Sequence, residues 1–373
     1  MWSSTANVDY MSLTAHFLTE DMKQIHICCD MVPFPYESHT ATNLVNFMNE
    51  SLERWGLLEK LNVVVRDNLR NIVSAMEVWK FTNIPCLAHT LQLVVKDGCL
   101  DNERISLLTA TCRRIAGHFK HLVKSYKLLR QSQEILGLHK HSIIQDEPTR
   151  YPYCSSLKVT TSEVIPIINA VNMSIDRIKD YGNFKESLCQ SLHRCYGDCE
   201  NEPIYAFATI IDPRFKNKIF RSRTMAEKAV TLLIGELNAL DIDEGHEIKA
   251  AENQEPTTPA PGAIWSLYNQ LIITNSVIYT AHFTMSDKVA VYLKEPLLAS
   301  HEDVFEYWRK SKFLNMKKLA QKYLGMPLCT VFSERLFSTA VLICNRKRGR
   351  LTPERVQMLV FLNKNLPFLN YQY

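Results

Sequence analysis

Cysteine and histidine side chains occur at two places with spacings close to those of metal ligands. Cys86 and His89 stand three residues apart, a spacing that could present two ligands to one zinc ion. Cys195 and Cys199, with His193 nearby, come closest to a second pair. A closed zinc site needs four ligands, and no second pair has the proper spacing. The pattern favours a buried structural cysteine and a hydrogen-bonded histidine over zinc.

Two carboxylates stand where an acidic side chain could serve a helix. Asp67 follows the β-branched run at 63–65 and precedes a helical pattern, so it could be an N-cap. Glu334 lies in the first turn of a later predicted helix, where a carboxylate interacts favourably with the helix dipole whether or not metal is bound. Taken alone, each residue has a structural explanation.

A short basic run could contact nucleic acid. Four positive charges fall within five residues in a predicted loop between two apolar helices: Arg346, Lys347, Arg348 and Arg350. Three interpretations stay open, namely a solvated loop, a phosphate-contacting or import-signal patch, and ion pairing across a dimer. The predicted helix around 113–130 adds further positive charge. Together they would allow weak, salt-sensitive DNA contact without base recognition.

The elements that position these residues begin as mixed α/β. Residues 10–17 alternate between apolar and polar, which predicts a half-buried strand with Met11 and Phe17 on the core face. Residues 24–29 alternate in the same way, and the short polar link between the two runs predicts a hairpin. A helical pattern then runs from Leu44 to Trp55.

The middle of the chain is predicted to be helical. The pattern is helical from about 88 to 136, and another helix at 157–178 is expected to be interrupted by Pro166. Residues 145–153 form a break. Residues 251–262 have the composition of a solvated linker or mobile loop.

Three helices are predicted near the C-terminus. The first covers 316–324, the second has Ser333 as N-cap, and the third begins at Thr352 with Pro353 in its first turn. Apolar residues cover more than one face of the last two helices: Leu336, Phe337, Val356, Leu359, Val360 and Leu362. This breadth fits either an intrachain core or a dimer interface, or both.

Composition narrows the class of protein. The chain has 373 residues, 46% of them hydrophobic, with a net charge of +4, which excludes collagenous and globally disordered classes and fits two to three domains. Eleven cysteines form no regular framework and no secretory leader precedes them, so we expect a reducing, intracellular environment. The best membrane-span candidate, 271–283, is interrupted by polar residues, so we expect no membrane partner.

Several runs together resemble one superfamily. Residues 331–340 (Val-Phe-Ser-Glu-Arg-Leu-Phe-Ser-Thr-Ala), followed by 345–350 and 351–365, resemble the C-terminal dimerisation signature of hAT-superfamily transposases. Residues 66–68 (Arg-Asp-Asn), 86–93, 212–214 (Asp-Pro-Arg) and 292–296 agree as well. The whole set resembles the vertebrate zinc finger BED domain-containing proteins, which are domesticated members of that superfamily.

The resemblance implies an α/β plus all-α architecture. A ribonuclease-H-like core with a truncated first strand would begin in residues 1–100. A shortened helical insertion would occupy 101–290, with a mobile linker near 251–262. A C-terminal dimerisation region at 291–373 would complete the core and self-associate through residues about 316–366. The resemblance also implies a nuclear location.

The chemistry of the superfamily is DNA strand transfer by two divalent metals held by three carboxylates. Asp67 matches the second acidic position and Glu334 the third, while the first would fall one residue ahead of Met1. We therefore expect a catalytically inactive protein without a cofactor, in which Asp67, Glu334, Cys86 and His89 are relics. Active relatives would use Mg²⁺, and zinc would belong only to a BED finger, which this chain lacks.

Other departures agree with this expectation. The Thr-Arg-Trp-Asn motif of the superfamily stands here as Thr149-Arg150-Tyr151-Pro152, without the tryptophan that contacts DNA. Our hypothesis is a domesticated homodimer that acts as a nuclear, DNA-associated or transcription-regulatory scaffold. The alternatives are a metal-dependent DNA transposase and a decaying fragment without function.

Overall fold

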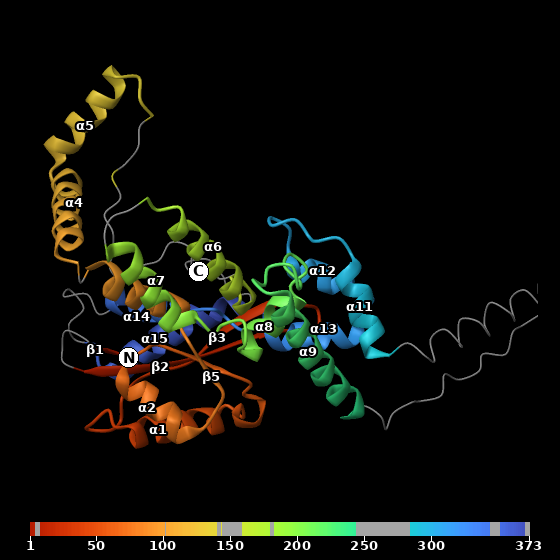
Figure 1. Cartoon of the computed structure of the whole chain (residues 1–373). Helices are drawn as coiled ribbons and strands as arrows, with labels where there is room; N and C mark the ends of the chain where they lie inside the picture. The colour runs from red at the N-terminus through yellow and green to blue at the C-terminus, as the bar shows by residue number, and fades with distance from the viewer. Residues whose placement is uncertain are drawn as a thin grey trace, which may run out of the picture.

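A long antiparallel hairpin lies at the centre of the structure, a computed structural model that describes residues 1–3, 8–100, 102–139, 143, 159–179, 183–243, 284–343 and 351–369 (Figure 1). Strand β2 (Asp9–Leu18) pairs with β3 (Gln24–Pro33), and the short β1 (Trp2–Ser3) pairs with the start of β2. A bulge shifts the register between Leu13 and Thr14. The predicted hairpin is confirmed, with both strands longer than expected.

Helices cover both faces of this sheet. Helices α1 (Ala41–Arg54) and α2 (Arg70–Trp79) pack with Met11 on one face. Helices α14 (Val331–Ile343) and α15 (Pro353–Asn365) pack with Tyr10, Cys28 and Met31 on the other. The predicted core face of the strand is right only in part: Met11 is buried as expected, but Tyr10, on the polar face, is 2% exposed and Phe17, on the apolar face, is 43% exposed.

A second, parallel sheet lies beside the hairpin. Strand β4 (Val64–Arg66) pairs with β5 (Asn83–Pro85), and the 3-10 turn η1 (Leu58–Lys60) precedes β4. Helix α3 (Leu87–Val95) follows β5 and continues as the π-helical turn η2 (Lys96–Leu100). A Cβ atom on Gly98 would lie 2.8 Å from the Cα atom of Leu188, so the close packing of η2 against α7 requires glycine there.

Two helices project from the body. The predicted helical stretch 88–136 continues beyond η2 as α4 (Glu103–His121) and α5 (Val123–Ile135). Neither helix buries a residue, and Figure 1 shows both standing away from the remaining elements. Among the described elements, α4 contacts α5, which follows it in the chain, and η2, which precedes it.

The largest hydrophobic core lies in a helical region. This region contains η4 (Thr161–Glu163), α6 (Val164–Asp176), α7 (Asn183–Tyr196), α8 (Pro203–Ile211), α9 (Arg223–Asp243), α11 (Met285–Lys294), α12 (Val304–Lys310) and α13 (Leu314–Leu324). Pro166 does not interrupt α6, as the sequence suggested, because it lies in the first turn, where its missing N–H has no helical acceptor. Helix α8 buries almost every side chain, in agreement with its continuous apolar run.

The C-terminal helices largely follow the prediction. Helix α15 begins with Thr352 as N-cap and Pro353 at its first position, as expected, and ends in the 3-10 turn η6 (Leu366–Leu369). Helix α14 begins at Val331, so the prediction of Ser333 as its N-cap is wrong. The main-chain N–H of Glu334 donates to the carbonyl oxygen of Thr330 at 3.2 Å, which places Ser333 inside the first turn.

Within the described ranges, no helix has the length and apolar composition needed to cross a bilayer. Several sequence predictions lie outside the described residues: the linker at 251–262, the stretch 271–283, the motif Thr149 to Pro152, and the basic residues Arg346, Lys347, Arg348 and Arg350. The fold is a mixed α/β architecture dominated by helices. The domain boundaries at 100 and 290 stay predictions.

Candidate functional site

A cavity of about 660 Å³ lies between the hairpin and the second sheet. Asp67 reaches it from the end of β4, His89 from the first turn of α3, and Glu334 from the first turn of α14. Each of these residues follows a strand or begins a helix, where a side chain can project past the edge of the regular structure. Folding thus brings to one cavity three residues that the sequence places far apart.

Asp67 bonds to the chain beside it. Its Oδ1 atom accepts a hydrogen bond from the main-chain N–H of Leu69 at 3.1 Å. Helix α2 starts at Arg70 with Leu69 in the N-cap position and no side-chain cap, so the N-cap interpretation of Asp67 is wrong. The carboxylate instead stabilises the turn that leads into the helix.

Glu334 and His89 face each other at the other side of the cavity. The distance from His89 Nε2 to Glu334 Oε1 is 3.8 Å, and both side chains are about one-third exposed. The interaction with Cys86 raises the pKa of His89; burial opposes this, and the charges of Glu334 and Asp67 add to it. The surroundings of His89 therefore favour its charged form more than water does.

Cys86 joins the start of α3 to the start of α14. The residue is fully buried, and its Sγ atom accepts hydrogen bonds from the N–H and hydroxyl groups of Thr330 at 3.3 and 3.5 Å. The same thiol lies next to His89, whose Nδ1 atom is buried without a hydrogen-bond partner among the described residues. Cys86 thus holds together the two helix starts that carry His89 and Glu334.

The donor set does not fit a pair of divalent metals. In the part of the chain that the structure describes, no three side chains of His, Cys, Asp or Glu lie close enough to share an ion. Two cations need several bridging carboxylates, and a protonated His89 beside Glu334 would repel a metal there. The described residues at this cavity therefore do not by themselves form a two-metal site.

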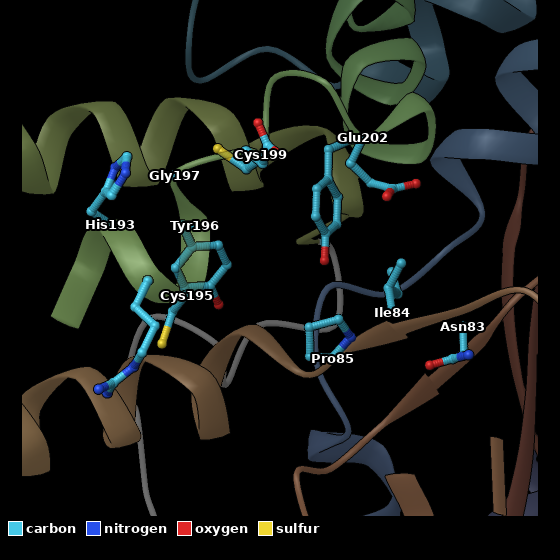
Figure 2. A pocket seen from close by; sticks show the side chains of 12 residues that line it. Asn83, Ile84, Pro85, His193, Cys195, Tyr196, Gly197, Cys199 and Glu202 are labelled. Atoms are coloured by element: carbon cyan, nitrogen blue, oxygen red, sulfur yellow. The ribbon is translucent and has the colours of Figure 1, made fainter. Parts of the chain in front are cut away.

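A second cavity, of about 560 Å³, is lined by the second pair of cysteines that the sequence suggested as zinc ligands (Figure 2). Cys195, Cys199 and His193 all line it, near the end of α7. Burial raises the pKa of the Cys199 thiol to about 11, with the charge of Glu200 adding to the effect, so the thiol is protonated at neutral pH in the metal-free protein. Figure 2 shows the sulfur atoms of Cys195 and Cys199 pointing in different directions, which agrees with the structural interpretation of this pair.

The apolar residues predicted for dimerisation divide into two groups. Leu336, Val356 and Val360 are buried under the sheet with Tyr10, and Phe337 is half-buried against the same cluster. Leu359 and Leu362, at 40% and 43% exposure, face away from that core. One group thus belongs to the intrachain core and the other is open to a partner.

The structure also shows a buried charged network that composition and spacing did not single out. Asp212, fully buried, accepts hydrogen bonds from the Ser162 hydroxyl at 2.7 Å and from Arg214, whose guanidinium makes two contacts of 2.7 and 3.0 Å to the carboxylate. Arg214 also pairs with Glu163 at 3.0 Å. The available signal was a run of charged residues directly after the apolar α8.

Lys216 completes this network on its other side. Its Nζ atom donates to the main-chain carbonyls of Tyr292 and Glu295 at 2.7 and 2.9 Å, and lies 4.5 Å from the centre of the Tyr292 ring. Both carbonyls lie at the C-terminal end of α11, where a cation is favoured. The charged run of 212–216 therefore connects three helical segments.

Two family models match parts of this chain. Residues 1–82 match the ZBED1 RNase-like domain, and residues 288–366 match the hAT family C-terminal dimerisation region. The chain is related to the hAT-derived zinc finger BED proteins. The family resemblance seen in the sequence is thus confirmed, and the cavity described above lies between the two matched regions, since Asp67 comes from one and Glu334 from the other.

Similarity along the whole of this chain supports the same relationship. Human zinc finger BED domain-containing protein 4 is 23% identical over all of this chain and 37% of its own length. Mouse zinc finger BED domain-containing protein 6 is 21% identical over all of this chain and 48% of its own length. The putative transcriptional regulator tpeD of Talaromyces stipitatus is 21% identical over 96% of this chain. The chain spans about half, or less, of the length of these relatives.

Proposed function

We propose that this chain is a regulatory protein that associates with a second copy of itself, contacts DNA in the nucleus without cutting it, and uses no metal cofactor. The relatives that carry BED zinc fingers or the description of a transcriptional regulator support the regulatory role and the nuclear location. The observation that carries the proposal is an exposed apolar face on α15, inside the region matched to hAT dimerisation.

The geometry of α15 supports self-association. Met358, Leu359 and Leu362 fall within about 100° of one another around the helix, and Val356 and Val360 lie on a separate side that packs on the sheet. The second pair holds the helix to the sheet, so the first three side chains are free to contact another surface. Clustered exposed apolar residues are typical of protein interfaces. A second copy would bury this face on both partners.

The contacts of the cavity support the absence of cleavage. The side chains of Asp67 and Glu334 each have a local partner, the main chain of Leu69 and the ring of His89. The ring of His89, whose pKa is raised, lies 3.8 Å from the carboxylate of Glu334 and so stands beside the group that would have to bind a metal. We infer that these four positions, Cys86 included, now serve the local structure.

The projecting helices support contact with DNA. Helices α4 and α5 carry seven basic residues and only two acidic ones, and both helices stand away from the body (Figure 1). An excess of positive charge on an accessible surface binds phosphate groups without reading the bases. The basic residues Arg346, Lys347, Arg348 and Arg350 would add to this contact.

Light scattering coupled to gel filtration tests self-association. We expect the mass of a dimer for the unmodified protein and of a monomer for Leu359→Asp. A matched control is Leu232→Asp, because Leu232 is an exposed leucine (48%) in the middle of α9 and outside the dimerisation helices. A monomeric unmodified protein, or dissociation by the control alone, would contradict the proposal.

The competing function is metal-dependent DNA transposition. It is favoured by the meeting of Asp67 and Glu334 at one cavity. A nicking assay on supercoiled DNA with Mg²⁺ separates the two functions, because we expect no cleavage above the rate without protein. Cleavage that the substitution Glu334→Gln abolishes would establish the transposase instead.

A further inference from the structure

An aromatic pair joins the end of α1 to α15. The rings of Trp55 and Phe361 are stacked, with their centroids 6.0 Å apart and their planes 27° from parallel. Phe361 is half-buried against the core between α15 and the sheet, whereas Trp55 is 40% exposed. A stacked aromatic pair is stabilised by more than the area that it buries. The contact therefore holds a large apolar side chain in place while much of its surface stays in contact with solvent.

The main chain at the end of α1 fixes the position of Trp55. Gly56 follows it in the left-handed conformation, with φ at 61°. The N–H of Gly56 donates to the carbonyl oxygen of Glu53 at 3.0 Å. The N–H of Leu57 donates to the carbonyl oxygen of Leu52 at 2.8 Å. This pair of hydrogen bonds is the Schellman motif, which ends a helix at a defined residue. Little conformational entropy would therefore be lost if a partner covered the tryptophan.

The end of α1 and the end of α15 are attached to the same strand, β3. The guanidinium group of Arg54 lies 2.6 Å from the buried carboxylate of Asp30. Two residues earlier in β3, the side-chain amide of Asn365 donates to the carbonyl oxygen of Cys28 at 2.8 Å and accepts from its N–H at 3.1 Å. In the described part of the chain, β3 has no neighbouring strand on that side, and this amide takes the place of one. The two segments thus have a fixed arrangement beside each other.

The exposed indole continues the apolar face of α15. Met358 precedes Phe361 by three residues and Leu362 by four, and residues with these spacings are neighbours on a helix surface. Leu359 precedes Leu362 by three residues in the same way. Met358, Leu362 and Leu359 are 63%, 43% and 40% exposed. The five side chains therefore form one apolar row, which starts at Trp55 and crosses Phe361 to the exposed face of α15.

The chemistry of this row indicates its partner. Its five side chains carry no charge, so they offer nothing to the phosphate groups of DNA. An apolar surface is best covered by another apolar surface. The row lies mostly in the region matched to hAT dimerisation, and a second copy carries the same row. Of the two partners, the second copy is therefore the one that fits.

We propose that Trp55 lies in the surface to which a second copy of this chain binds, beside the apolar face of α15. The inference rests on the proposed self-association, and it adds residues 1–82, which carry Trp55, to a surface otherwise built from residues 288–366. A dimer with two-fold symmetry buries the same surface on both partners, so both copies of Trp55 would be covered. Tryptophan is enriched among the residues that contribute most to protein interfaces.

Sedimentation equilibrium of the full chain tests the proposal by measuring the dissociation constant of the dimer. We expect Trp55→Ala to raise this constant at least about tenfold, and Trp55→Phe, which keeps an aromatic ring, to change it by less than about threefold. The control is Leu314→Ala, because Leu314 is an exposed leucine (68%) at the start of α13, and it should leave the constant unchanged. An unchanged constant in Trp55→Ala would overturn the proposal.

Oxidative footprinting of the unmodified protein decides the matter even if Trp55→Ala disturbs α15. Hydroxyl radicals should oxidise Trp55 about threefold more slowly above the dissociation constant than below it, because the dimer covers the ring. Met173, which is 59% exposed on α6, should react equally at both concentrations. A dimer in which Trp55 stays fully reactive would overturn this inference alone. A monomer at every concentration would overturn the proposed self-association with it.

Discussion

Two clusters of charged residues in this molecule are held in opposite ways. Around Asp212, every described partner lies within 3.0 Å, and the cluster is buried between η4, α8 and the loop that follows α8. Around Glu334, the contact with the His89 ring is 3.8 Å long, and both side chains border the cavity between the hairpin and β4. Buried charges must be paired to be tolerated, whereas partly exposed ones need not be. The comparison leads us to expect that the stability of the helical scaffold depends more on the Asp212 cluster than the stability of the cavity depends on Glu334.

The largest expected effect comes from breaking the buried cluster. Arg214→Met should lower the free energy of unfolding by about 3–5 kcal/mol, because it leaves two buried carboxylates, Asp212 and Glu163, without their cation. Chemical denaturation followed by circular dichroism measures the loss. Arg223→Met is the control, since Arg223 is highly exposed. A loss no greater than that of the control would show that the cluster is not needed for stability.

Lys216→Met should have the next largest effect. The substitution keeps the length of the side chain but removes the donor to two carbonyl groups at the end of α11, at an expected cost of about 1–3 kcal/mol. The same denaturation experiment measures it. Burial lowers the pKa of Lys216, which shows that its buried charge is itself costly. The substitution removes this cost together with the hydrogen bonds, so the loss of stability should stay below that of Arg214→Met. A greater loss of stability in Lys216→Met than in Arg214→Met would contradict the view that the paired carboxylates depend most on their cation.

Glu334→Gln should change stability little. The side chain is partly exposed and its contact with His89 is long, so we expect a change within about 0.5 kcal/mol. Equilibrium unfolding in urea checks this. A loss as large as that of Arg214→Met would mean that the two clusters serve the fold equally.

The smallest expected effect is the pH dependence due to His89. Its folded-state pKa is raised above the ordinary value, so its contribution to stability is complete below the unfolded pKa and is lost as pH rises through the folded pKa. The stability lost in His89→Asn should therefore be greater at acidic than at alkaline pH. Nuclear magnetic resonance titration of the ring should also show a lower pKa for His89 in Glu334→Gln. Identical titration curves in the two proteins would remove Glu334 from the causes of the shift.

Some of the architecture was predictable because it depends on local patterns. The hairpin follows from two alternating runs joined by a short polar link, and the start of α15 follows from Thr352 and Pro353, whose conformations suit a helix N-terminus. The burial of Tyr10 did not follow, because α14 and α15 reach that face of the sheet from more than three hundred residues away. Alternation shows which residues share a face but does not show what covers that face.

The candidate site divides in the same way. The residue types and motifs at Asp67, His89 and Glu334 were visible in the sequence, but their meeting at one cavity and the 3.8 Å contact were not. The apolar pattern of α14 and α15 predicted burial on two sides, and only the packed structure separates the buried Leu336 from the exposed Leu359. Helical spacing predicts an apolar face for Leu336 and for Leu359 alike, and does not show which of the two faces is covered.

By itself, the sequence determined the family relationship, the hairpin and the start of α15, because motifs, alternation and capping act over a few residues. The tertiary structure alone decided which charges are buried with partners, which apolar residues stay open, and which residues meet at the cavity between the hairpin and β4. These features arise where segments distant in the chain come into contact. The burial of a residue and the strength of its electrostatic interactions depend on all the segments that surround it.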